Sequence, residues 1–137
     1  MNLEELRIGN YIHTTDTNQN VPVSGISAFT NQVWVNLNPF APSDANNVEP
    51  IPLTEELLLI CGFNTDYKSG YIGIDVNDSD FVLSYPGRMG KFQKYFAFEF
   101  NTGRLCRFIE IPYLHNLQNL FFSHTGKELE VNHERLY

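Results

Sequence analysis

Residues 75–80 carry a group of oxygen ligands: Asp75, Asn77, Asp78 and Asp80. Carboxylate and amide oxygens at such spacing are the ligands that an EF-hand loop offers to Ca²⁺. That loop also needs glycine at its sixth position and glutamate at its twelfth, and a loop starting at Asp75 has Asp80 and Pro86 there. We therefore interpret the acidic run as a solvated turn between two strands.

Histidine and cysteine are too dispersed along the chain for a zinc site. His115 and His124 are nine residues apart and would lie on opposite faces of one helix. His124, His133 and Glu134 would converge only if the C-terminal tail folded back. We assign no metal ligand and no cofactor.

The two thiols, Cys61 and Cys106, lack the setting of an activated nucleophile. Cys61 is expected at the C-terminal end of a helix, where the dipole raises the pKa of a thiol. Cys106 stands between Arg104 and Arg107, a better setting for a thiolate, but strand alternation would equally bury it. An enzyme would need a pocket that brings Cys106 or His124 close to acidic groups. We assign no catalytic residue.

Five of the nine basic residues fall within an expected hairpin at 85–107, with the aromatic residues Tyr85, Phe92 and Phe96 interleaved. Cations that contact phosphates, beside rings that stack on bases, are how proteins hold single-stranded nucleic acid. The simpler interpretation is that these charges protect a sheet edge, because the chain as a whole carries a net charge of −7. The candidate nucleic-acid surface consists of Arg88, Lys91, Lys94, Tyr95, Arg104 and Arg107.

Residues 112–126, PYLHNLQNLFFSHTG, carry the start and stop signals of one amphipathic helix. Proline is tolerated at the first helical position, and glycine suits the left-handed residue past the end. A helical wheel turns Phe122 outward, on a polar arc opposite the core-facing leucines. An outward ring can anchor a protein partner, although another part of the chain would equally cover it. The candidate partner surface consists of His115, Gln118, Asn119 and Phe122.

The remaining pattern predicts an α+β fold with antiparallel strands. β-branched and aromatic runs at 20–29 and 31–38 predict an N-terminal meander of the SH3-like kind. The proline-rich segment 38–50 is expected to be an exposed loop without regular structure. Thr54 and Gly62 bracket a short helix whose apolar residues 57–60 should be buried on every side.

Strands are expected again in the second half of the chain. The runs 71–76 and 80–85 predict one hairpin, and 91–100 with 104–111 predict a second, joined at Asn101–Gly103. Alternation in 91–100 would place Phe92, Phe96, Phe98 and Phe100 on one face. A last short strand is expected at 128–131. The chain fits a single domain, 1–137, with a subdivision into a meander at 1–53 and a helix–hairpins–helix part at 54–137 as the alternative.

Composition sets further limits. Of the 137 residues 42% are hydrophobic and 14% aromatic, enough for a packed core. The net charge of −7 argues against general binding to nucleic acid or to anionic membranes. No apolar run approaches the roughly 20 residues of a membrane span, and the N-terminus lacks the pattern of a signal peptide. We expect a cytoplasmic protein, monomeric or homodimeric.

Three segments together resemble a family of small uncharacterised proteins of gut bacteria, their phages and mobile elements. They are LRIGNYI at 6–12, IPLTEELLLICGF at 51–63 and YLHNLQNLFFSHTGKELEV at 113–131. Asn116 stands where glutamine is usual in that family, which keeps the polar character. The resemblance implies a genetic setting and supplies no catalytic residue. The sequence thus favours a non-enzymatic adaptor that binds a protein partner, with a nucleic-acid accessory protein as the second hypothesis and an enzyme as the third.

Overall fold

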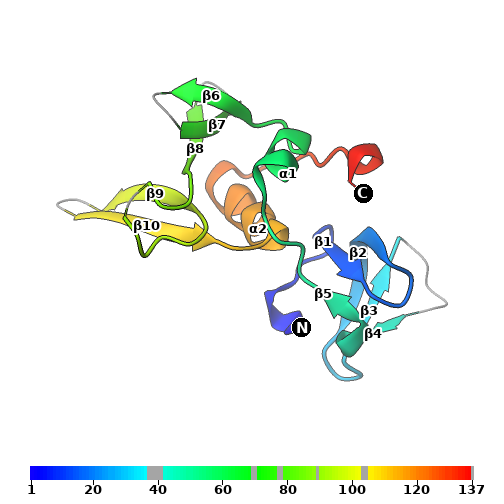
Figure 1. Cartoon of the computed structure of the whole chain (residues 1–137). Helices are drawn as coiled ribbons and strands as arrows, with labels where there is room; N and C mark the ends of the chain where they lie inside the picture. Colours follow the sequence, from blue (N-terminus) through cyan, green and yellow to red (C-terminus); the bar gives the residue numbers. More distant parts are fainter. Residues whose placement is uncertain (37–41, 69–70, 77–78, 89, 103–104, 137) are drawn as a thin grey trace. The chain divides into compact units, whose positions relative to one another are not determined.

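The computed structural model describes residues 1–36, 42–68, 71–76, 79–88, 90–102 and 105–136. These residues form an α+β protein with two antiparallel five-stranded sheets and a C-terminal helix (Figure 1). The chain divides into two compact units. Unit 1 comprises Met1–Pro52 and Tyr113–Leu120, and unit 2 comprises Leu53–Pro112 and Phe121–Leu136.

The sheet of unit 1 has the strand order β4-β3-β2-β1-β5. Its elements are η1 (Leu3–Glu5), β1 (Tyr11–Thr14), β2 (Gln19–Ser27), β3 (Gln32–Val35), β4 (Ser43–Asp44), η2 (Ala45–Asn47) and β5 (Val48–Glu49). The first three strands form the expected meander. The Asn2 side chain caps η1 by accepting a hydrogen bond from the backbone N–H of Glu4.

The segment 42–50 is not the loop that the proline content predicts. β4 pairs with β3, and β5 returns to pair with β1, with η2 between them. Asp44 caps η2 by accepting the N–H of Asn46 at 2.9 Å. Ala45 and Val48 are buried in the unit 1 core together with Ile12, Val21, Val23 and Val33. The prediction was wrong because long-range pairing and burial, which local composition does not report, hold these two-residue strands. Residues 37–41 lie outside the described part of the chain.

Unit 2 contains the second sheet, with the strand order β10-β9-β8-β7-β6. Its elements are α1 (Glu55–Ile60), β6 (Asn64–Lys68), β7 (Tyr71–Val76), β8 (Ser79–Ser84), β9 (Phe96–Thr102), β10 (Leu105–Ile111) and η3 (His133–Arg135). The helix α2 (Leu114–Thr125) begins in unit 1 and ends in unit 2. Gly126 follows it with φ of 72°, as expected for the residue past a helix end.

The helix α1 starts and stops where its sequence predicts. The Thr54 hydroxyl accepts the backbone N–H of Leu57 at 3.1 Å. Gly62 has φ of 90°, and the N–H of Phe63 donates to the carbonyl of Leu58 at 3.0 Å, which forms a Schellman motif. Burial on every side was a wrong expectation, since Leu59 is exposed while Leu57 and Leu58 are buried.

The first expected hairpin is formed by β7 and β8 in antiparallel register, with Asp75 opposite Asp80. In the second hairpin, β9 starts only at Phe96, so the expected strand from residue 91 is wrong at its beginning. Phe92 therefore does not belong to the apolar face of β9, and its side chain is exposed, whereas Phe96 is buried. The turn residue Gly103 lies outside the described residues. Residues 128–131 form no strand, contrary to expectation.

The core of unit 2 is built around aromatic side chains. The ring of Phe81 packs edge-on against Phe63 and Phe121, with centroids 6.2 and 5.1 Å away, and stacks on Phe98 at 4.8 Å. Such offset and edge-on arrangements stabilise an aromatic cluster beyond simple burial. Within the described ranges, no helix has the length and apolarity needed to cross a membrane.

Candidate functional site

The polar residues of α2 that were assigned to a partner surface lie in unit 1 and are largely enclosed by its N-terminal segment. Gln118 is 2% exposed and His115 is fully buried. The amide oxygen of Gln118 accepts the backbone N–H of Tyr11 at 2.8 Å, and its amide nitrogen donates to the carbonyl of Gly9 at 3.1 Å. The outward orientation expected for His115 and Gln118 is therefore wrong. Both side chains serve the folding of unit 1.

Asn119 belongs to the same hydrogen-bond network. Its Oδ1 accepts from Nε of Arg7 at 3.0 Å and from Nδ2 of Asn10 at 2.9 Å. Its Nδ2 donates to the carbonyl of Glu5 at 3.0 Å. All three of these hydrogen bonds join the Asn119 amide to residues 5–10. A helical wheel that divides residues into apolar and polar arcs does not predict these contacts. Buried polar groups of this kind are retained because each finds a partner.

His115 sits between Glu5 and Tyr113. Its Nε2 lies 3.3 Å from Oε2 of Glu5, and its ring stacks nearly parallel to the Tyr113 ring at 5.8 Å. Burial lowers the pKa of His115, and the hydrogen bond and charge of Glu5 oppose this only in part. His115 is thus neutral at neutral pH, and among the described residues its Nδ1 meets no hydrogen-bond partner.

Phe122 is the one member of the candidate partner surface whose outward orientation is confirmed. It lies in unit 2 and is 41% exposed, beside the exposed residues Ser123 and His124. The ring of His124 lies 4.6 Å from that of Phe98. His124 was expected on the core-facing arc, and its exposure corrects that expectation.

The basic residues of the second candidate surface gather in a loop between β8 and β9. We call residues 85–88 and 90–95 the basic loop. Its cations Arg88, Lys91 and Lys94 are all exposed, and Phe92 is 82% exposed. Nζ of Lys91 lies 5.2 Å from the centroid of the Phe92 ring, and Cζ of Arg88 lies 4.1 Å from that of Tyr71. Arg104 and the Arg107 side chain lie outside the described part.

Gln93 holds the basic loop in shape. Its side chain is 5% exposed, and its Nε2 donates to Oγ of Ser84 at 2.9 Å and to the carbonyl of Tyr95 at 3.1 Å. Its carbonyl accepts the N–H of Gly87 at 2.9 Å. Gly87 and Gly90 adopt φ of 83° and 134°, values that L side chains rarely reach. The chain therefore leaves the strand path at this point, and Phe92 is turned into solvent.

Three carboxylates lie near the base of the loop. Oε2 of Glu110 accepts the backbone N–H groups of Lys94 and Tyr95 at 3.3 and 3.2 Å. Burial raises the pKa of the Tyr85 hydroxyl, and the charges of Glu55 and Asp66 raise it further. The Glu110 carboxylate is engaged with the backbone. Arg88, Lys91 and Lys94 are exposed residues.

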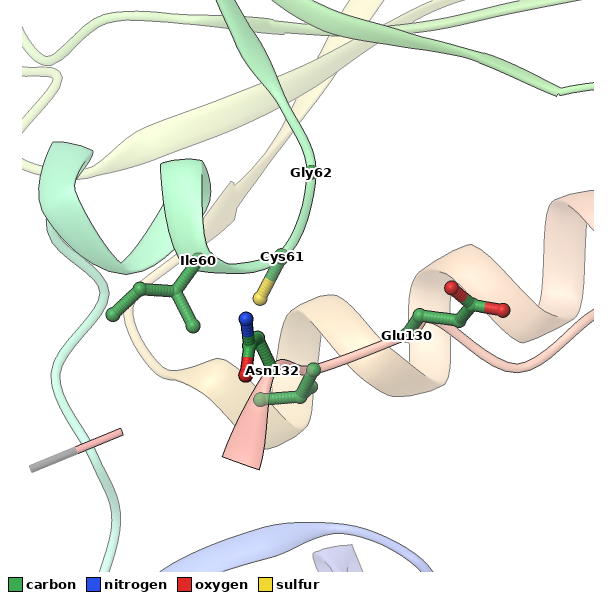
Figure 2. Close-up of a pocket in the computed structure, with 6 residues that line it drawn as sticks. Ile60, Cys61, Gly62, Glu130 and Asn132 are labelled. Atoms are coloured by element: carbon green, nitrogen blue, oxygen red, sulfur yellow. The ribbon is translucent and has the colours of Figure 1, made fainter. Parts of the chain in front are cut away.

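A cavity of about 330 Å³ in unit 2 is lined by Ile60–Gly62 and Glu130–Asn132 (Figure 2). The sulfur of Cys61 and the side chain of Asn132 point toward one another across it. Burial raises the pKa of the Cys61 thiol to about 12, so it stays protonated and is a poor nucleophile. The cavity gives no support to a reaction at this thiol. Within the described residues, no three side chains of the metal-binding types gather into a site.

No family model, no curated protein and no solved structure matches this chain.

Proposed function

We propose that this protein is a non-enzymatic binding protein that holds an anionic partner at the basic loop. The observation that carries the proposal is the ring of Phe92, 82% exposed to water, in one loop with the three exposed cations Arg88, Lys91 and Lys94. An exposed ring can provide a contact surface, and cations in the same loop favour a partner of negative charge.

The distribution of charge supports the loop as the contact. The chain carries a net charge of −7, yet no carboxylate occurs between Asp80 and Glu99, the stretch that contains Arg88, Lys91 and Lys94. A local cationic site on an acidic protein attracts a polyanion over short range, while the rest of the surface repels it. Binding should therefore be confined to the loop and sensitive to salt.

The reactive groups of the described residues support binding rather than catalysis. The Cys61 thiol is buried with a raised pKa, and His115 is buried in the unit 1 network. Both side chains contribute to packing.

We further propose that the fold of unit 1 is an SH3-like barrel. The strand order β4-β3-β2-β1-β5 supports this fold, with the 3-10 helix η2 between β4 and a last strand, β5, that returns to pair with β1.

The segments 6–12, 51–63 and 113–131 support an origin in a phage or mobile element of gut bacteria. A free, buried Cys61 fits a reducing cytoplasm.

Chromatography on immobilised heparin tests this function, because heparin is a polyanion without bases. Arg88→Gln with Lys91→Gln removes one arginine and one lysine from the loop, and Lys127→Gln with Arg135→Gln makes the same change in charge elsewhere in unit 2. We expect the loop variant to elute at clearly lower salt than wild type and the control variant to elute close to wild type. Equal shifts for both variants would attribute retention to total charge and would contradict the proposal.

A second candidate function is capture of a protein partner through Phe122, whose ring is 41% exposed on α2. Phe122→Ala is a clean test, whereas Asn119→Ala would also break the bonds to Arg7 and Asn10. Loss of a co-purifying protein from the Phe122→Ala variant would support this candidate. Retention of every partner would remove it, and native mass spectrometry would show in the same sample whether the chain is a monomer or a homodimer.

A further inference from the structure

We propose that the anionic partner of the basic loop is single-stranded nucleic acid, with one base stacked on Phe92 and phosphates contacting Arg88, Lys91 and Lys94. This inference rests on the proposed function and adds the class of ligand. The ring and the three cations all belong to the basic loop.

The exposure of Phe92 is the first argument. Most of the ring surface faces water, because the side chain is 82% exposed, and Nζ of Lys91 lies 5.2 Å from the ring centroid. Every nucleobase has a flat π-face that stacks on such a ring without regard to sequence. A duplex hides these faces inside its own stack, so an exposed ring selects unpaired bases.

The spacing of charges around the ring is the second argument. Lys91 directly precedes Phe92, Lys94 follows two residues later, and Arg88 lies four residues before it. Tyr95 adds a second ring that is 44% exposed. Alternating rings and cations within a few residues match a ligand that itself alternates bases and phosphates. An acidic peptide offers the charges without the stacking faces.

The hydrogen bonding within the described residues of the loop is the third argument. The buried side chain of Gln93 bonds to Ser84 and Tyr95, and the backbone N–H of Gly87 closes on the Gln93 carbonyl. Hydrogen bonds that already hold the backbone around Phe92 reduce the conformational freedom that is lost when a base stacks on the ring. Glu110 contributes to the same order by accepting the N–H groups of Lys94 and Tyr95.

The test is fluorescence anisotropy with the full chain and labelled oligothymidylate of about 12 nucleotides, within the range of known single-strand sites. An abasic strand of the same length keeps the phosphates and removes the bases. We expect oligothymidylate to bind about tenfold more tightly than the abasic strand, which is within the range of one stacked base. The logarithm of the association constant should fall linearly with the logarithm of the salt concentration, with a slope of about −2 for three phosphate contacts. A parallel titration with oligouridylate shows whether RNA or DNA is the better ligand.

Variants separate stacking from simple attraction. Phe92→Ala should lower the affinity for oligothymidylate about tenfold and leave the abasic strand unchanged. Phe92→Leu keeps an apolar side chain without a ring and should behave like Phe92→Ala. Phe29→Ala is the matched control, because Phe29 is fully exposed in a turn of unit 1 without neighbouring cations. Both positions are exposed, so these changes leave the core intact, which circular dichroism would verify.

The outcomes distinguish the ligand class from the proposed function. Equal binding of the oligothymidylate and abasic strands, or wild-type affinity in Phe92→Leu, would overturn base stacking while leaving the loop as a polyanion site. No binding of either strand, together with no retention on heparin, would overturn both.

Discussion

Oε1 of Gln118 lies 2.8 Å from the backbone nitrogen of Tyr11 and accepts its hydrogen bond, while Nε2 of the same side chain donates to the carbonyl of Gly9. One amide side chain of α2 thus satisfies two main-chain groups just before and at the start of β1. The segments LRIGNYI and YLHNLQN meet at this point. Their polar residues therefore have a structural role in unit 1.

Gln118→Ala should destabilise the protein by about 1–3 kcal/mol, because a donor and an acceptor of the backbone lose their partner. Urea unfolding followed by circular dichroism measures the change. Ser123→Ala, an exposed position on the same helix, is the control and should change stability by less than about 0.5 kcal/mol. Equal stabilities of the two variants would contradict the role assigned to Gln118.

His115 should make stability depend on pH. Burial lowers its pKa in the folded state below the unfolded value of about 6.5. The unfolded chain then binds a proton that the folded chain does not, so this contribution is complete above pH 6.5 and is lost as pH falls below it. The free energy of unfolding of the wild type should fall between about pH 7.5 and 5.5, and less so in His115→Gln. Parallel pH profiles for the two proteins would contradict this prediction.

Substitution of Gly62 should destabilise the protein because of the backbone conformation at this position. Its φ of 90° closes α1, and an added Cβ would meet only Cδ1 of Ile74 at an ordinary distance of 3.6 Å. The cost of Gly62→Ala, about 1–2 kcal/mol, therefore comes from the left-handed conformation. Gly25→Ala is the matched control, since its added Cβ would contact Trp34 at 3.5 Å without a positive φ. Thermal unfolding should show a loss only for Gly62→Ala, and a loss of equal size in both would point to crowding instead.

The Cys61 thiol should react slowly with iodoacetamide in the native protein. It is 2% exposed, and burial raises its pKa to about 12, so little thiolate forms at pH 8. Mass mapping of the peptide that contains Cys61 measures its alkylation separately from that of Cys106. Rapid modification should appear only after denaturant is added. Equal rates with and without denaturant would show that the cavity beside Cys61 opens freely to solvent.

Local signals were enough to predict part of the fold. Thr54 and Gly62 define α1 because capping depends on neighbouring backbone groups only. The hairpin of β7 and β8 follows from β-branched runs around a polar turn. These elements are determined by residues that are close in sequence.

The remainder depends on contacts between distant residues. β4 and β5 contain two residues each and exist because β3 and β1 pair with them. The alternating sequence pattern around Phe92 predicts a strand, but Gln93 is buried against Ser84 and the strand starts only at Phe96. A single sequence contains no signal for either contact.

The candidate sites were predicted unevenly for the same reason. The helical wheel treats polarity as exposure, and it failed at His115 and Gln118, whose partners lie about 110 residues earlier in the chain. Charge counting placed Arg88, Lys91 and Lys94 in one short segment, and the structure shows all three as exposed residues of the basic loop. Phe92 was recognised as an aromatic neighbour, but its exposure could not be derived from alternation.

The most direct test of the basic loop as the binding surface is a ¹H–¹⁵N correlation spectrum of labelled protein titrated with oligothymidylate. It reports the site of contact residue by residue, whatever the affinity. We expect the largest shifts at the amides of 87–88 and 90–95, with unit 1 unchanged. Shifts centred on unit 1 or on Phe122, or a spectrum that does not change at all, would contradict the assignment of binding to this loop.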